Sequence, residues 1–159
     1  MLVKGITDED FVNYKLPSMF IATPICSFKC ENECGVRCCQ NSALVKQKNW
    51  EINTEAVIKR YLRNKITKAI VFGGLEPLDR PFDVLEFLSK LRILYKCDDP
   101  VVIYTGYYPD ELPRFMGKFK EYKNVIMKFG RYIPGQEPHF DEVLGVNLAS
   151  DNQYGEVIS

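Results

Sequence analysis

The sequence has no excess of charge of one sign and no long apolar segment. Its 159 residues include 21 Lys plus Arg and 21 Asp plus Glu, so the formal net charge is zero. A neutral chain has no global field that attracts nucleic acid or an anionic membrane, and we expect neither partner. No apolar run approaches the ~18 residues of a membrane span. The N-terminus reaches acidic residues by Asp8 without the apolar core of a signal peptide, which predicts a cytoplasmic protein.

Histidine is also scarce, because His139 is the only one and lies in a polar loop. We interpret it as a solvated side chain, which disfavours a catalytic Cys–His pair. The chain shows no internal repeat, low-complexity stretch or linker. Its length therefore indicates a single domain over residues 1–159.

Hydrophobic residues make up 46% of the chain, charged residues 26% and aromatic residues 13%, the balance of a globular protein with a sizeable core. Short apolar runs alternate with segments of helical periodicity, which predicts βαβ units and a mostly parallel sheet. The expected strands are 18–23, 68–72, 101–104 and 124–129, with a possible last strand near 156–158. The expected helices are 53–64, a second that starts at Pro81, and 110–120.

Cysteine is the feature that requires an explanation. Five of the six cysteines fall between Cys26 and Cys39, and the sixth, Cys97, is interpreted as a packing residue. A cluster of this kind in a reducing compartment indicates a metal or redox site, because soft thiolates bind iron–sulfur clusters or zinc. Three ligands would leave one iron of a four-iron cluster open, whereas four would close a structural site. A zinc knuckle remains the alternative.

Two further motifs follow predicted strands. In segment 73–77, paired glycines allow a ligand to approach the backbone, and Glu76 offers a carboxylate to an ammonium group; an ordinary turn is the alternative. In segment 104–108, hydroxyls and aromatic faces suit a ribose or an adenine. The alternative is an ordinary strand end with exposed tyrosines. Ligands bind at the carboxyl ends of parallel strands, so we expect these motifs and the cysteine loop to meet at one edge.

Together these segments resemble the radical S-adenosylmethionine (radical SAM) superfamily, and within it the anaerobic ribonucleotide reductase activating proteins. The family's cysteine loop ends as Cys39-Gln40-Asn41-Ser42 does, and its Gly-Gly-Glu/Asp-Pro-Leu segment is similar to residues 73–78, with Leu75 as an extra residue. Its Tyr-Thr-Gly-Tyr segment is matched by 104–107. Weaker echoes of the family occur at 129–132 and 150–153.

The resemblance implies a fold and a set of ligands. The fold would be α/β, a partial TIM-like barrel with a mostly parallel sheet. Cys26, Cys30 and Cys39 would hold a 4Fe-4S cluster whose open iron chelates SAM. Cys34 is the alternative third ligand, because the usual spacing of three and then two residues is interrupted here by an apparent insertion over 31–38. The SAM-binding residues implied in the same way are Phe28 near the adenine, Gly73, Gly74 and Glu76 at the methionine end, and Tyr104 and Thr105 near the ribose.

The function implied is a small radical SAM enzyme that cleaves SAM reductively to a 5′-deoxyadenosyl radical and installs a glycyl radical on an anaerobic ribonucleotide reductase. The implied partners are that large glycyl-radical protein and an electron donor such as flavodoxin or ferredoxin. The alternatives are a radical SAM enzyme with another substrate, and a zinc-binding module without catalysis. The residues leave open the roles of Cys34 and Cys38, which we expect to be free thiols or a local redox pair.

Overall fold

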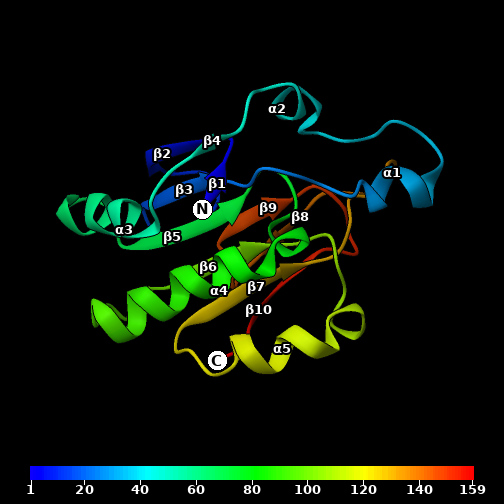
Figure 1. Cartoon of the computed structure of the whole chain (residues 1–159). Helices are drawn as coiled ribbons and strands as arrows, with labels where there is room; N and C mark the ends of the chain where they lie inside the picture. The colour runs from blue at the N-terminus through cyan, green and yellow to red at the C-terminus, as the bar shows by residue number, and fades with distance from the viewer.

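The computed structural model describes the backbone of residues 1–159 and every side chain except that of residue 113. It confirms the α/β class and the mostly parallel sheet. Four parallel strands lie next to one another in chain order: β3 (Ser18–Ala22), β5 (Ala69–Gly73), β6 (Val101–Tyr104) and β7 (Val125–Phe129) (Figure 1). Antiparallel strands β2 (Gly5–Asp10) and β10 (Tyr154–Val157) flank them, so this six-stranded sheet is open, with β2 and β10 at its edges.

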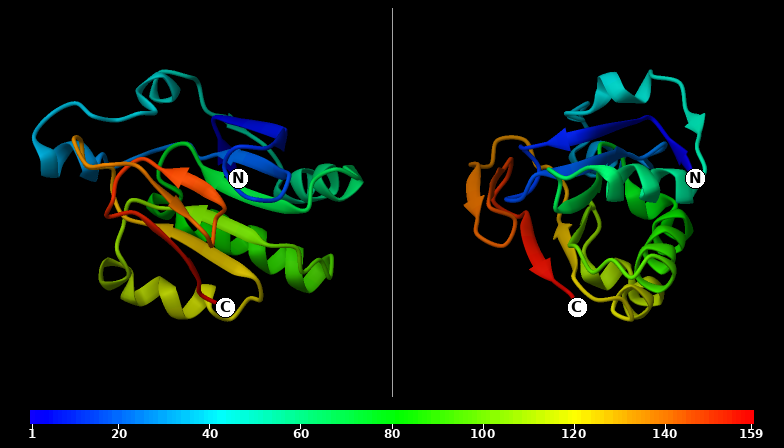
Figure 2. Two further views of the ribbon diagram at one scale, coloured as in Figure 1. Left: turned by 180° about the vertical axis from the view of Figure 1, so that it is seen from behind. Right: turned by 90° about the vertical axis from the view of Figure 1, so that its left-hand side faces the viewer.

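Three helices connect the parallel strands and cover one face of the sheet, as Figures 1 and 2 show. They are α3 (Thr54–Arg63), α4 (Pro81–Ser89) and α5 (Pro113–Phe119). The predicted cap of the first helix is confirmed, because Asn53 Oδ1 accepts hydrogen bonds from the Glu55 and Ala56 amides at 2.9 and 3.2 Å. The second helix continues into a π-helical segment, Lys90–Leu94.

Side chains alternate between two apolar cores along each strand, as strand geometry requires. Ile70 and Phe72 pack toward the helices, whereas Ala69 and Val71 face a smaller core on the opposite side. A hairpin of β8 (His139–Asp141) and β9 (Val146–Leu148) lies over that opposite face (Figure 2). The sheet therefore has one face closed by helices and another covered by the tail of the chain.

The third predicted helix is shorter than expected. Residues 109–111 form a 3-10 turn, and α5 begins only at residue 113. Proline has no amide hydrogen and disfavours a helical conformation in the preceding residue, so the sequence Leu112-Pro113 separates the two turns. The expected tail strand is present as β10, but it begins two residues earlier and pairs antiparallel with β7.

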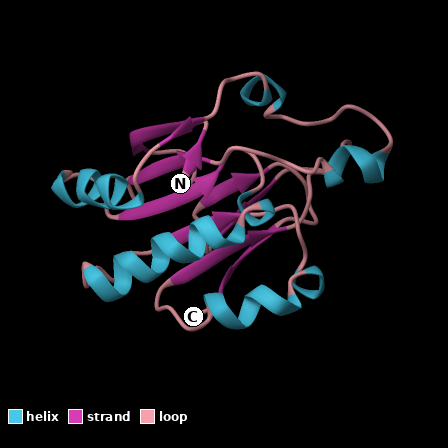
Figure 3. Cartoon of the chain, viewed as in Figure 1, coloured by secondary structure: helices cyan, strands magenta, loops and turns pink.

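The cysteine segment leaves the sheet at the carboxyl end of β3 and forms two short helices, α1 (Lys29–Cys34) and α2 (Ser42–Val45) (Figure 3). It returns through β4 (Trp50–Glu51), which pairs with β1 (Leu2–Val3). The Lys4 ammonium ties down the return path, because it donates to the Val45 and Gln47 carbonyls. Within the part of the chain that the structure describes, no helix combines the length and the apolar character needed to cross a membrane.

Candidate functional site

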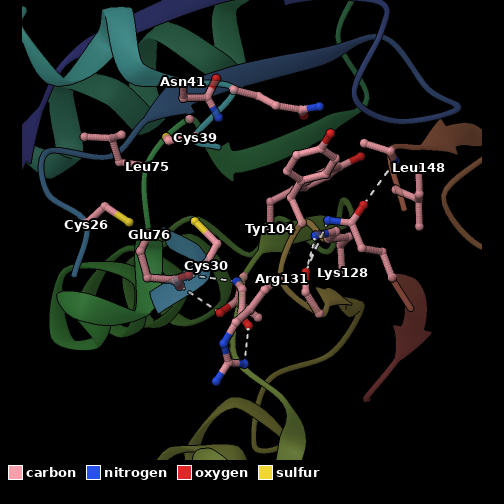
Figure 4. Close-up of a pocket in the computed structure, with 18 of the residues that line it drawn as sticks. Cys26, Cys30, Cys39, Asn41, Leu75, Glu76, Tyr104, Lys128, Arg131 and Leu148 are labelled. Atoms are coloured by element: carbon pink, nitrogen blue, oxygen red, sulfur yellow. Dashed lines mark hydrogen bonds between the residues drawn. The ribbon is translucent and has the colours of Figure 1, made fainter. Parts of the chain in front are cut away.

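A cavity of about 460 Å³ lies at the carboxyl ends of the parallel strands (Figure 4). Its volume falls within the range of small-molecule sites. The wall is built from the loops after β3, β5, β6 and β7, together with the turn after β2 and the end of β9. Segments that are far apart in the sequence thus meet where the strand order predicts a ligand site.

Seven of the nine predicted site residues line this cavity: Cys26, Cys30, Cys39, Gly74, Glu76, Tyr104 and Thr105. The other two predicted residues, Phe28 and Gly73, do not line the wall as the structure describes it. Phe28 lies just before α1 in a left-handed conformation, and a Cβ at Gly73 would stand 3.0 Å from the Phe20 ring. Phe20 and Tyr104 are the aromatic side chains that the wall offers from β3 and β6.

Hydrogen bonds join the cysteine loop to the loop after β5. The Thr23 amide donates to the Gly73 carbonyl at 2.9 Å, and the Glu76 amide donates to the Ile25 carbonyl at 3.0 Å. The Ser27 amide and hydroxyl both donate to the Asp79 carboxylate. Cys26, which lies between these contacts, is therefore held beside Glu76 (Figure 4).

The cavity thiols differ from Cys34, the last residue of α1, and from Cys38, in the loop after it. Burial raises the pKa of the Cys26 thiol to about 12, and burial also raises that of Cys30. Cys34 and Cys38 lie off the cavity wall as the structure describes it, with their sulfurs 3.2 Å apart. Among the described residues, no group of three Cys, His, Asp or Glu side chains is arranged to hold one metal ion. The donor set on the wall is nonetheless three thiols, the ligands that iron–sulfur clusters take.

An ionic network positions α1 over the cavity. Lys29 Nζ lies 2.7 Å from Glu111 Oε1 and 4.3 Å from the centre of the Tyr107 ring. The buried Arg131 guanidinium donates to both oxygens of Glu111 and contacts Glu33 at 2.9 Å. Hydrogen bonds from Arg131 and then from Lys29 lower the pKa of Glu111 to about 2. Helix α1 is thus tied to the loop after β6 through Lys29 and to the loop after β7 through Glu33.

Glu76 is buried on the wall and bonded to its neighbours. Its Oε1 accepts from the Thr105 hydroxyl at 2.7 Å and from the Leu78 amide at 3.0 Å, and its Oε2 accepts from the Gly106 amide at 2.8 Å. Burial raises the pKa of Glu76 to about 7, although these hydrogen bonds oppose the rise. A carboxylate oxygen has two acceptor positions, so Oε2 retains one for a ligand.

Lys128 is a cavity residue that the sequence reasoning missed. It lies in the otherwise apolar strand β7, and its ammonium donates to the Gly130 carbonyl at 2.6 Å. Burial lowers the pKa of Lys128 to about 8, while the nearby Glu76 and Cys30 charges oppose that change. A single lysine within the run Val125–Phe129 was the signal, because a buried lysine inside an apolar strand is uncommon.

The backbone approaches closely at Gly74. This residue has φ +81°, and a Cβ there would stand 2.7 Å from Leu44 Cδ2 and 3.4 Å from Ala22 Cβ. The glycine thus supplies both a left-handed turn after β5 and room for α2.

Comparisons with protein-family models, curated proteins and solved structures found no match.

Proposed function

We propose that this chain is a radical SAM iron–sulfur enzyme that cleaves SAM reductively and installs a glycyl radical on an anaerobic ribonucleotide reductase. The observation that carries the proposal is the joint placement of Cys26, Cys30 and Cys39 with Gly74 and Glu76 around one cavity at the carboxyl edge of the parallel strands. These residues belong to two motifs that lie more than thirty residues apart in the sequence.

The donor set fits the cofactor, since Cys26, Cys30 and Cys39 provide three soft thiolates on one wall. Under the proposal these residues hold a 4Fe-4S cluster. When bound and reduced, such a cluster supplies the electron that breaks a carbon–sulfur bond of SAM. The third ligand is Cys39 because it lines the cavity, whereas Cys34 lies beside Cys38 off the wall that the structure describes.

The chain's own part in the reaction is to bind and orient SAM. Glu76 accepts from the methionyl ammonium through the free position on Oε2, while Thr105 and the Gly106 amide keep the carboxylate in place. Gly74 lines the wall beside Glu76, and the Tyr104 and Phe20 rings provide faces for the nucleoside. Enclosure by the loops limits the access of water to the reacting atoms.

The sheet order supports a barrel interpretation and an open substrate side. Consecutive parallel strands with their helices on one face are the winding of a β/α barrel, and four such strands would form part of one.

At the cavity mouth, Val12 is 73% exposed, and its neighbour Phe11 is 64% exposed. Exposed apolar side chains beside a site are typical of a surface that contacts a protein, which suits a large glycyl-radical partner.

The experiment begins with anaerobic purification and metal analysis of the full chain. Iron with matching sulfide supports the proposal, whereas stoichiometric zinc without iron would support a binding module. The reconstituted protein is then mixed with SAM, a reduced flavodoxin or ferredoxin and an anaerobic ribonucleotide reductase, and the glycyl radical is measured by electron paramagnetic resonance. SAM cleavage without a glycyl radical on any such reductase would move the assignment to another radical SAM substrate.

A further inference from the structure

A pair of thiols outside the cavity wall has no part in the proposed reaction. The sulfurs of Cys34 and Cys38 are 3.2 Å apart. Cys34 is the last residue of α1, and Cys38 follows an exposed turn of three residues, 35–37. Two thiols within hydrogen-bond distance, one at the end of α1 and one in the loop after it, form a dithiol site.

The turn between the two cysteines explains why their sulfurs meet. Gly35 caps α1 at φ 70° and donates its amide to the Glu31 carbonyl at 2.9 Å, which reverses the chain. A disulfide has its sulfurs about 2.05 Å apart, so the two atoms need to approach by only about 1 Å. Both thiols are half-buried, and the exposed turn leaves room for a small reagent to reach them.

We propose that Cys34 and Cys38 form a reversible disulfide by exchange with a low-molecular-weight disulfide. The thiolate of one cysteine attacks the reagent, forms a mixed disulfide and releases one thiol. The thiolate of the other cysteine then displaces the second thiol and closes the bond. The two cysteine thiols are oxidised, the reagent's sulfur–sulfur bond is reduced, and the two protons leave on the released thiols.

The bond would close a ring directly before Cys39. The Cys39 amide already donates to Glu31 Oε1 at 3.0 Å, so the ring would hold the backbone beside a wall cysteine without consuming that cysteine's thiol. Cys30 is the competing partner, because it also lies close to Cys38. The inference does not depend on a cluster and can be tested on the cluster-free chain.

The test exposes the reduced, cluster-free full chain to oxidised glutathione under anaerobic conditions, blocks the free thiols and maps tryptic peptides by mass spectrometry. Trypsin cuts after Lys29 and Arg37, which separates peptide 30–37 from peptide 38–46. The proposal predicts a disulfide crosslink between these two peptides that dithiothreitol reverses. Four single serine variants then identify the sulfurs that form it.

The crosslink should fall to background in Cys34→Ser and Cys38→Ser and persist in the matched controls Cys30→Ser and Cys39→Ser. In the two sensitive variants, the remaining thiol should retain a glutathione adduct. Persistence of the crosslink in Cys34→Ser, its loss in Cys30→Ser, or the formation of adducts alone in the wild-type chain would each overturn the proposal. None of these outcomes depends on iron or SAM, so this failure and that of the proposed enzyme are distinguishable.

Discussion

Glu76 combines burial, three hydrogen bonds and a place on the cavity wall. Its folded pKa of about 7 lies above the ordinary value of 4.5, so the folded state binds the proton more tightly than the unfolded state. Between pH 4.5 and 7 the unfolded state releases this proton first, and the free energy of unfolding therefore falls as the pH rises. Across that window the fall amounts to about 3 kcal/mol.

Glu76→Gln should remove this pH dependence, because the amide does not titrate. The measurement is denaturant unfolding of the cluster-free chain on both sides of the window, with the exposed Glu142→Gln as a control. A pH dependence that survives in Glu76→Gln and equals that of the wild type would show that another group is responsible.

The same residue carries a binding prediction. An ammonium–carboxylate hydrogen bond is worth about 1.5–3 kcal/mol, so Glu76→Gln should weaken SAM binding about tenfold to a hundredfold and leave iron content unchanged. The affinity of the wild type should also rise as the pH passes about 7, where the Glu76 carboxylate forms. Titration calorimetry of the reconstituted protein measures both. Equal affinity in the two proteins would reduce Glu76 to a structural role.

At the residue scale, cysteine and Glu76 were recognisable because their types and spacing already point to thiolate and ammonium chemistry. Lys128 was missed, since a lone lysine in an apolar strand indicates an unusual buried charge but not where that charge lies, and it is the fold that places Lys128 on the cavity wall. The resemblance to the radical SAM family implied a place for Phe28 near the adenine. In the structure Phe28 has a left-handed backbone with φ 55°, and it does not line the cavity wall as described.

Helix α1 depends on the ionic contacts that hold it to the loops after β6 and β7. Since Arg131 lowers the pKa of Glu111 to about 2, the stabilisation is complete above the ordinary value of 4.5 and is lost as the pH falls toward 2. Glu111→Gln should cost about 2 kcal/mol at neutral pH and flatten this acid limb, because it leaves the buried Arg131 charge less well paired. Unfolding is measured as the pH falls from 4.5 to 2 in the wild type, in Glu111→Gln and in the exposed control Glu121→Gln. The same loss of stability with falling pH in all three proteins would contradict the prediction.

The junction of β5 and α2 depends on Gly74. Gly74→Ala adds a Cβ that meets Leu44 at 2.7 Å and forces a side chain into φ +81°, so the substitution should destabilise the fold by about 1–3 kcal/mol. The matched control is Gly117→Ala within α5, where nothing lies within 4 Å, and this change should stabilise by up to about 1 kcal/mol. Thermal unfolding compares the two variants. Equal effects would contradict the close approach at Gly74.

The buried elements were predictable and the peripheral ones were not. Strands such as Ala69–Gly73 are apolar throughout because helices cover one side and a second core the other. The edge strand Gly5–Asp10 carries three acidic residues. Because acidic residues are uncommon in strands, the sequence does not indicate an extended conformation there. The hairpin of β8 and β9 has only three residues in each strand, too few for a clear alternation.

At the scale of the whole molecule, the exposed apolar residues at the cavity mouth predict where a protein partner docks. Phe11→Asp should lower glycyl-radical formation on the reductase about tenfold, because a charge in an apolar interface is costly. It should leave SAM cleavage unchanged, because Phe11 is exposed and does not line the cavity. The control is Ile93→Asp, an aliphatic residue of similar exposure on the π-helical segment. Equal radical yields for the two variants would place the docking surface elsewhere.

The most direct measurement is the formation of 5′-deoxyadenosine from SAM by the reconstituted, chemically reduced chain. We expect 5′-deoxyadenosine and methionine in equal amounts. Cleavage should be lost in Cys26→Ala, Cys30→Ala and Cys39→Ala and retained in Cys34→Ala and Cys38→Ala. Loss in Cys34→Ala with retention in Cys39→Ala would exchange the third ligand and leave the enzyme assignment standing. A protein that holds a full iron–sulfur cluster yet forms no 5′-deoxyadenosine, even with the reductase present, would contradict the central claim.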